Sequence, residues 1–114
     1  MTHNGADWGG VFLHLDAPFD AASYTQLVVS MKLPARVVDL QIKLESSGGR
    51  GEELSIRRFD TTALGDGWVD FSIPLKKFKR PDLREVVIIG FWHPKDKRGD
   101  YVAGDVLIDN IRFE

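Results

Sequence analysis

The sequence contains no cysteine, no long hydrophobic run and no excess of charge of one sign. Without cysteine the chain cannot form disulfides or use a thiolate as nucleophile or metal ligand. No run approaches the roughly 18 apolar residues needed to cross a bilayer. The 15 basic and 17 acidic residues are mixed along the chain, whereas nucleic-acid binders concentrate positive charge on one face. We therefore expect neither a membrane nor a nucleic acid as partner.

The sequence also lacks a segment with a helical stripe of apolar residues, and its 114 residues suit one domain. Eleven glycines and five prolines separate short apolar runs, a composition typical of many short strands joined by turns. No signal peptide is visible at the N-terminus. We expect a single all-β domain over residues 1–114.

Alternation of apolar and polar residues predicts about seven strands. Strands without intervening helices favour antiparallel pairing, so we predict a two-sheet antiparallel β-sandwich of seven or eight strands. Between the strands we expect a flexible loop at residues 46–51, one helical turn at residues 75–78 and a bulge at Asp109 and Asn110. The predicted strands are Val11–Leu15, Gln26–Leu33, Val38–Glu45, Leu54–Arg57, Trp68–Pro74, Glu85–Trp92 and Gly104–Phe113.

Three motifs occur in the order found in one known group of domains: Gly67–Leu75 followed by Phe78, then Val86–Phe91, then Val106–Phe113. In this order the chain resembles the jelly-roll carbohydrate-binding modules of families 4, 11 and 30 and related galactose-binding-like domains. It departs from them because such modules usually have another strand before the strand that follows Gly9-Gly10, and here only about ten residues precede that strand. A missing first strand would leave an unpaired edge.

The resemblance implies a non-catalytic domain that binds polysaccharide or oligosaccharide, of β-glucan type, on the concave face of one sheet. It further implies a larger, secreted or cell-surface bacterial protein in which a linked glycoside hydrolase is brought to its substrate. Some of the related modules hold a structural Ca²⁺, and otherwise no cofactor is implied.

A sugar site combines an aromatic plane with polar groups that hydrogen-bond hydroxyls. Alternation places Gln41, Lys43 and Glu45 opposite the apolar side of their strand, with Arg57 across the hairpin. If Val87, Ile89 and Phe91 face the core, Trp92 points outward beside Gly90, where glycine would leave room for a ligand. His14 has the outward parity of the first strand. These residues are our candidate carbohydrate-binding site: Trp92, Gln41, Lys43, Arg57, His14 and Glu45.

The other tryptophans and the acidic residues are less distinctive. We expect Trp68 in the core, while Trp8 could be a rim aromatic or an anchor near the terminus. Asp109 is the candidate metal ligand, with Asp7 and Asp105 as further carboxylates. Ca²⁺ takes six to eight oxygens, which one aspartate at a bulge cannot supply.

Two other functions remain open from the residues alone. A glycosidase needs two carboxylates facing each other across the scissile bond, and nothing distinguishes such a pair among the many acids of this chain. A structural or protein-interaction domain could instead use an exposed edge strand to contact another chain. We therefore predict no enzymatic activity and retain protein interaction as the alternative.

Overall fold

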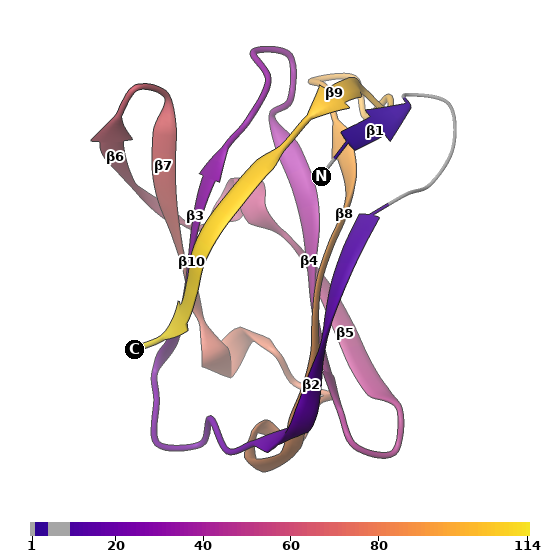
Figure 1. The fold of residues 1–114 in the computed structure, drawn as a ribbon, viewed down its shortest axis with the longest axis vertical. Coiled ribbons are helices and arrows are strands. Elements are labelled where there is room, and N and C mark those ends of the chain that lie inside the picture. The colour runs from indigo at the N-terminus through magenta and orange to yellow at the C-terminus, as the bar shows by residue number, and fades with distance from the viewer. Residues whose placement is uncertain (1, 5–9) are drawn as a thin grey trace.

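The computed structural model describes residues 2–4 and 10–114 and confirms the predicted two-sheet antiparallel β-sandwich (Figure 1). The described residues form ten strands and three short 3-10 turns. The strands are β1 (Thr2–Asn4), β2 (Gly10–Phe19), β3 (Gln26–Lys32), β4 (Asp39–Ser46), β5 (Arg50–Ser55), β6 (Asp60–Gly65), β7 (Trp68–Pro74), β8 (Val86–Lys95), β9 (Ala103–Asp105) and β10 (Leu107–Phe113).

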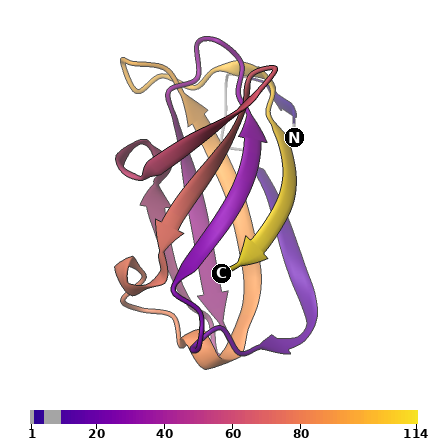
Figure 2. The ribbon, with the colours of Figure 1, turned by 90° about the vertical axis from the view of Figure 1, so that its left-hand side faces the viewer.

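The two main sheets each contain four strands and face each other across the core. One sheet has the order β2-β8-β4-β5 and the other β10-β3-β7-β6, while β1 pairs with β9 in a separate two-stranded sheet. Figure 2 shows the second main sheet in front of the first. Strands β2 and β8, and likewise β3 and β7, are neighbours although they are far apart in the sequence. Only long-range pairing can build such sheets, because hairpins join sequence neighbours alone.

The core consists of the apolar residues that alternate along the inner face of each sheet. In β4, Leu40, Ile42 and Leu44 are fully buried and alternate with partly exposed polar residues. From the opposite sheet, β3 contributes Leu27 and Val29 to the same hydrophobic cluster. The apolar residues predicted to alternate along these strands are therefore the ones that pack into the core.

In β8 the inward residues differ from those we predicted. Ile89 and Phe91 are buried, but Val86 is buried in place of Val87. The pairing of β8 with β4 shifts between Glu45 and Ser46. One extra residue at this bulge reverses the parity of the start of the strand.

Other differences lie at strand ends and at the edges. The hairpin partner of β4 is β5, which begins inside the predicted loop at Arg50 and ends at Ser55. Strand β6 has six exposed residues and only one large apolar side chain, Leu64, so its sequence shows no alternation to reveal it. A strand, β1, does precede Gly10, but it pairs with β9 and leaves β2 at an edge.

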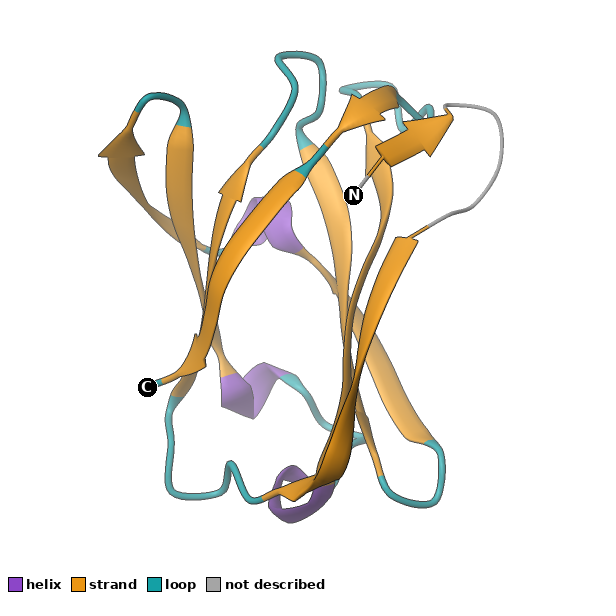
Figure 3. Cartoon of the chain, viewed as in Figure 1, coloured by secondary structure: helices purple, strands orange, loops and turns teal. Residues whose placement is uncertain are grey.

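The three 3-10 turns are η1 (Ile56–Arg58), η2 (Leu75–Lys77) and η3 (Leu83–Glu85), drawn in purple in Figure 3. The turn predicted at residues 75–78 is thus present as η2. Within residues 2–4 and 10–114, no helix has the length and apolar character required to cross a membrane.

Candidate functional site

Five of the six candidate residues lie on the outer face of the β2-β8-β4-β5 sheet. The register places Trp92 of β8 beside Gln41 of β4. The next two rows along β4 contain Lys43 and Glu45, and the Glu45 row continues through β8 to His14 of β2. Residues two apart on a strand point to the same side of a sheet. The face predicted from alternation therefore exists in the structure.

Trp92 packs against an aromatic ring that the sequence analysis did not select. Phe12 of β2 contacts Trp92 edge to face, with ring centroids 5.5 Å apart. The same Phe12 ring lies over Gly90, where an added Cβ would be 2.2 Å from Phe12 Cδ1. Our expectation that Gly90 leaves room for a ligand is thus wrong, because a side chain of the protein occupies that space.

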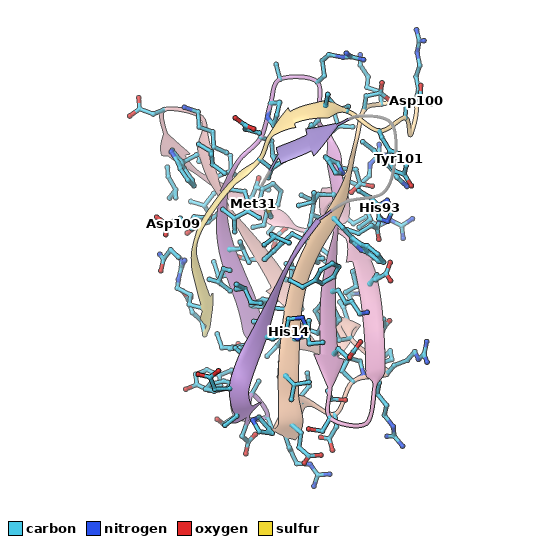
Figure 4. The ribbon with its side chains drawn as sticks, turned by 45° about the vertical axis from the view of Figure 1, so that its right-hand side comes forward. His14, Met31, His93, Asp100, Tyr101 and Asp109 are labelled. Atoms are coloured by element: carbon cyan, nitrogen blue, oxygen red, sulfur yellow. The ribbon has the colours of Figure 1, made fainter. Side chains whose placement is uncertain are left out.

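The aromatic contacts continue past Trp92. His93 lies 4.5 Å from Trp92 between ring centroids, and Tyr101 lies 5.1 Å from His93. Figure 4 shows His93 and Tyr101 next to each other near one end of the sheet. We call Phe12, Trp92, His93 and Tyr101 the aromatic strip.

A bulge in β8 explains how two successive residues join the strip. The pairing of β8 with β4 passes from Trp92–Gln41 to Lys95–Asp39, so β8 has one extra residue there. His93 has a φ of 57°, in the left-handed region. Such a backbone is uncommon for a residue other than glycine and is typical of bulges and binding sites. The bulge brings the His93 ring alongside Trp92 instead of on the opposite face.

Charged groups flank the strip. Lys43 Nζ lies 5.9 Å from the Trp92 ring centroid and Lys95 Nζ lies 5.6 Å from that of Tyr101. Both distances are within the range of a cation–π contact. Lys43 Nζ also forms an ion pair with Glu45 at 3.1 Å. The face therefore combines aromatic rings with ammonium donors and a carboxylate acceptor.

His14 lies away from the strip, and Arg57 does not belong to a strand of this sheet. His14 is exposed on β2, and in Figure 4 it lies well below His93 and Tyr101. Arg57 does not belong to the hairpin strand, because β5 ends at Ser55 and Arg57 lies in η1. The prediction that Arg57 belongs to the hairpin strand is therefore wrong. A 3-10 turn breaks the alternation on which that prediction depended.

Trp68 lies on the outer face of the opposite sheet, so our placement of it in the core is also wrong. It is half-buried at the start of β7, beside Lys32 of β3. The inward residues of β7 are Phe71 and Ile73, which have the opposite parity. Trp8 lies outside the described residues.

Asp109 lies in β10, where the predicted bulge is confirmed by a register shift and by the φ of 50° at Asn110. Its Oδ1 accepts a hydrogen bond from the Asn110 backbone N–H at 2.8 Å. Asp105 lies in β9, and Asp7 is outside the described residues. No group of three potential metal ligands occurs among the side chains that the structure describes. Asp109 thus has no described carboxylate cluster around it that could hold Ca²⁺.

The outer face of the second sheet has a polar network that we did not predict. Asp70 of β7 accepts hydrogen bonds from the Ser30 hydroxyl and from Arg112 Nη2, the latter at 2.9 Å. Arg112 Nε also donates to Glu114 Oε2 at 2.6 Å. The hydrogen bonds from Ser30 and Arg112 hold the pKa of Asp70 below its ordinary value. Arg112 thereby reaches from β10 across β3 to β7 and fastens an edge strand to the sheet.

Comparison of the chain with protein-family models, with curated proteins and with solved structures found no match.

Proposed function

We propose that this domain binds a polysaccharide chain on the outer face of the β2-β8-β4-β5 sheet and does not cleave it. The observation that carries the proposal is the aromatic strip with Lys43 and Gln41 beside Trp92. Aromatic rings pack against the apolar C–H faces of sugars, while ammonium and amide groups hydrogen-bond their hydroxyls. The resemblance to β-glucan-binding modules supports the same ligand class.

We propose binding without cleavage because the Glu45 carboxylate is engaged by Lys43. The two form an ion pair, which suits a fixed hydrogen-bond acceptor. A glycosidase instead requires two carboxyl groups that face each other across the scissile bond. The domain would serve by tethering: it would raise the local concentration of substrate for a linked enzyme of a secreted or cell-surface protein.

Affinity electrophoresis tests the proposal with soluble polysaccharides such as mixed-linkage glucan and xyloglucan. We expect retardation of the wild type, at an affinity on the order of micromolar to millimolar, or about −8 to −4 kcal/mol. Trp92→Ala should abolish the retardation. Trp68→Ala is the matched control, because Trp68 is also half-buried but lies on the outer face of the other sheet.

Loss of retardation in Trp68→Ala with retention in Trp92→Ala would overturn the proposed face. No retardation of the wild type by any polysaccharide would overturn the function itself.

A specific observation favours a second candidate, self-association through the open edge of the sandwich. Strands β2 and β10 lie at the edges of the two sheets. Between them is a groove of about 200 Å³, lined by residues of both strands and by Phe91. Val11 and Leu13 on β2 are 38% and 41% exposed. Exposed apolar edge strands pair readily with another chain.

We propose a second copy of this chain as the occupant of that edge. The segment from Val11 to Leu15 contains no Asp, Glu, Lys or Arg, so two β2 edges can pair about a twofold axis without like-charge repulsion. Light scattering should show a dimer that Leu13→Asp dissociates and Leu64→Asp, on the β6 edge of the other sheet, does not. A monomer at all concentrations would exclude the pairing.

A further inference from the structure

A cavity lies where η1 and η2 approach the end of β5, and none of the four residues of the aromatic strip lines it. Its volume is about 340 Å³, within the range of small-molecule sites. The cavity is lined by Leu54, Ser55, Arg58, Phe59, Asp60, Ser72, Pro74 and Lys77. These residues come from β5, η1, β6, β7 and η2, with Phe59 between η1 and β6, so the cavity exists only in the folded chain.

The lining has two cations that the protein does not neutralise. Arg58 and Lys77 belong to different 3-10 turns, and both are exposed. Neither forms an ion pair with any residue that the structure describes. Asp60 is the one carboxylate of the lining. The net charge of the lining is thus +1, from two cations and one anion, which matches a monoanion better than a doubly charged phosphate.

The uncharged lining residues further restrict the class of ligand that the cavity can bind. Phe59, Leu54 and Pro74 are apolar, and the lining also includes two serines, Ser55 and Ser72. The Ser55 hydroxyl donates its proton to Asp39 Oδ1 at 2.6 Å, so its oxygen is left to accept a hydrogen bond from a ligand. Asp60 can likewise only accept when ionised. These acceptors fit a ligand with several hydroxyl groups.

We infer that this cavity is a binding site for a sugar that bears one carboxylate, that is, a uronic acid unit. Arg58 and Lys77 bind the carboxylate, and a guanidinium can do so through two parallel hydrogen bonds. Asp60 and Ser55 accept hydrogen bonds from the sugar hydroxyls, and Phe59 packs against the C–H face of the ring. Ser55 pairs with Gln41, which lies beside Trp92, but the cavity and the aromatic strip have no residue in common. The ligand of the cavity therefore need not be part of a chain bound on the strip.

Titration calorimetry with sodium D-glucuronate tests the inference, with D-glucose and sodium acetate as comparison ligands. We expect saturable binding of glucuronate, with a dissociation constant on the order of millimolar. Glucose and acetate should each bind at least about tenfold more weakly, because each offers only half of the groups that the cavity recognises. Equal binding of glucose or of acetate would overturn the inference, as would no saturable binding of glucuronate.

The chain offers a matched pair of variants for the same experiment. Arg58→Gln with Lys77→Gln removes the two lining cations and should weaken glucuronate binding at least about tenfold. Arg57→Gln with Lys76→Gln removes the same charge from the adjacent positions of the same two turns, which do not line the cavity. We expect this control to change the affinity less than about twofold, because exposed charges are screened.

An equal loss in both double variants would show attraction to net charge without a site and would overturn the inference. Circular dichroism verifies that each variant is folded. Trp92→Ala should leave glucuronate binding unchanged, so failure of the polysaccharide proposal and failure of this one are distinguishable. If Trp92→Ala abolished glucuronate binding, the ligand would lie on the aromatic strip and not in this cavity.

Discussion

The contact between Phe12 and Gly90 can be tested with the substitution Gly90→Ala. We expect it to lower the stability of the wild type and to raise the stability of a Phe12→Ala variant. In the wild type, the Cβ of Gly90→Ala would lie 2.2 Å from Phe12 Cδ1 and 2.5 Å from Phe12 Cε1. Non-bonded carbon atoms normally approach to about 3.5–4.0 Å. The ring must therefore move away from Gly90, and in doing so it disturbs its edge-to-face contact with Trp92.

The expected cost follows from these two contacts. Overpacking by one methyl group costs about 1–3 kcal/mol, and an aromatic pair contributes about 0.5–1.5 kcal/mol beyond its buried area. We therefore expect Gly90→Ala to lower the free energy of unfolding by about 1–4 kcal/mol, depending on how much of the aromatic contact is lost. In a Phe12→Ala background the obstacle is absent. There, Gly90→Ala should raise stability by about 0.4–1 kcal/mol, because alanine restricts the unfolded chain.

Urea unfolding followed by circular dichroism measures the four variants of this double-mutant cycle. Gly51→Ala is the control on the same sheet face. Its Cβ would meet Lys43 Cε at 2.9 Å and Glu45 Oε1 at 3.1 Å, which are the mobile ends of long side chains. We expect it to change stability by less than about 0.5 kcal/mol. The same destabilisation by Gly90→Ala with and without the Phe12 ring would refute the packing described above.

Two further predictions concern stability. Hydrogen bonds from Ser30 and Arg112 lower the folded-state pKa of Asp70. The ionised carboxylate therefore stabilises the fold at pH values above the unfolded-state pKa of about 3.9. This stabilisation is lost as the pH falls through the lower folded-state pKa. Asp70→Asn should therefore be less stable than the wild type at pH 7 and lose less stability on acidification; parallel pH profiles from urea unfolding would contradict this. Gly10→Ala should lower the free energy of unfolding by at least about 1–3 kcal/mol. Its Cβ would lie 2.3 Å from the carbonyl oxygen of Phe91, a backbone atom that cannot rotate away. An unchanged urea midpoint would exclude that clash.

Much of the fold and part of the site could be predicted from local patterns. The alternation of Leu40, Ile42 and Leu44 with Gln41 and Lys43 located β4 and assigned each residue to a face. A strand repeats every two residues wherever it lies, so this assignment needs no knowledge of its neighbours. The same rule failed where the alternation of side chains is broken, at the β8 bulges and at η1. It therefore assigned Val87 and Arg57 wrongly.

What the sequence by itself determined is the all-β class, the position of most strands and the grouping of Trp92, Gln41 and Lys43 on one face. Only the tertiary structure decided that Phe12 covers Gly90, that Arg112 reaches Asp70, and that two 3-10 turns contribute residues to one cavity. These contacts join residues distant in the chain. They depend on the order and register of the strands, which are set by packing of the whole core and not by the period of any one segment.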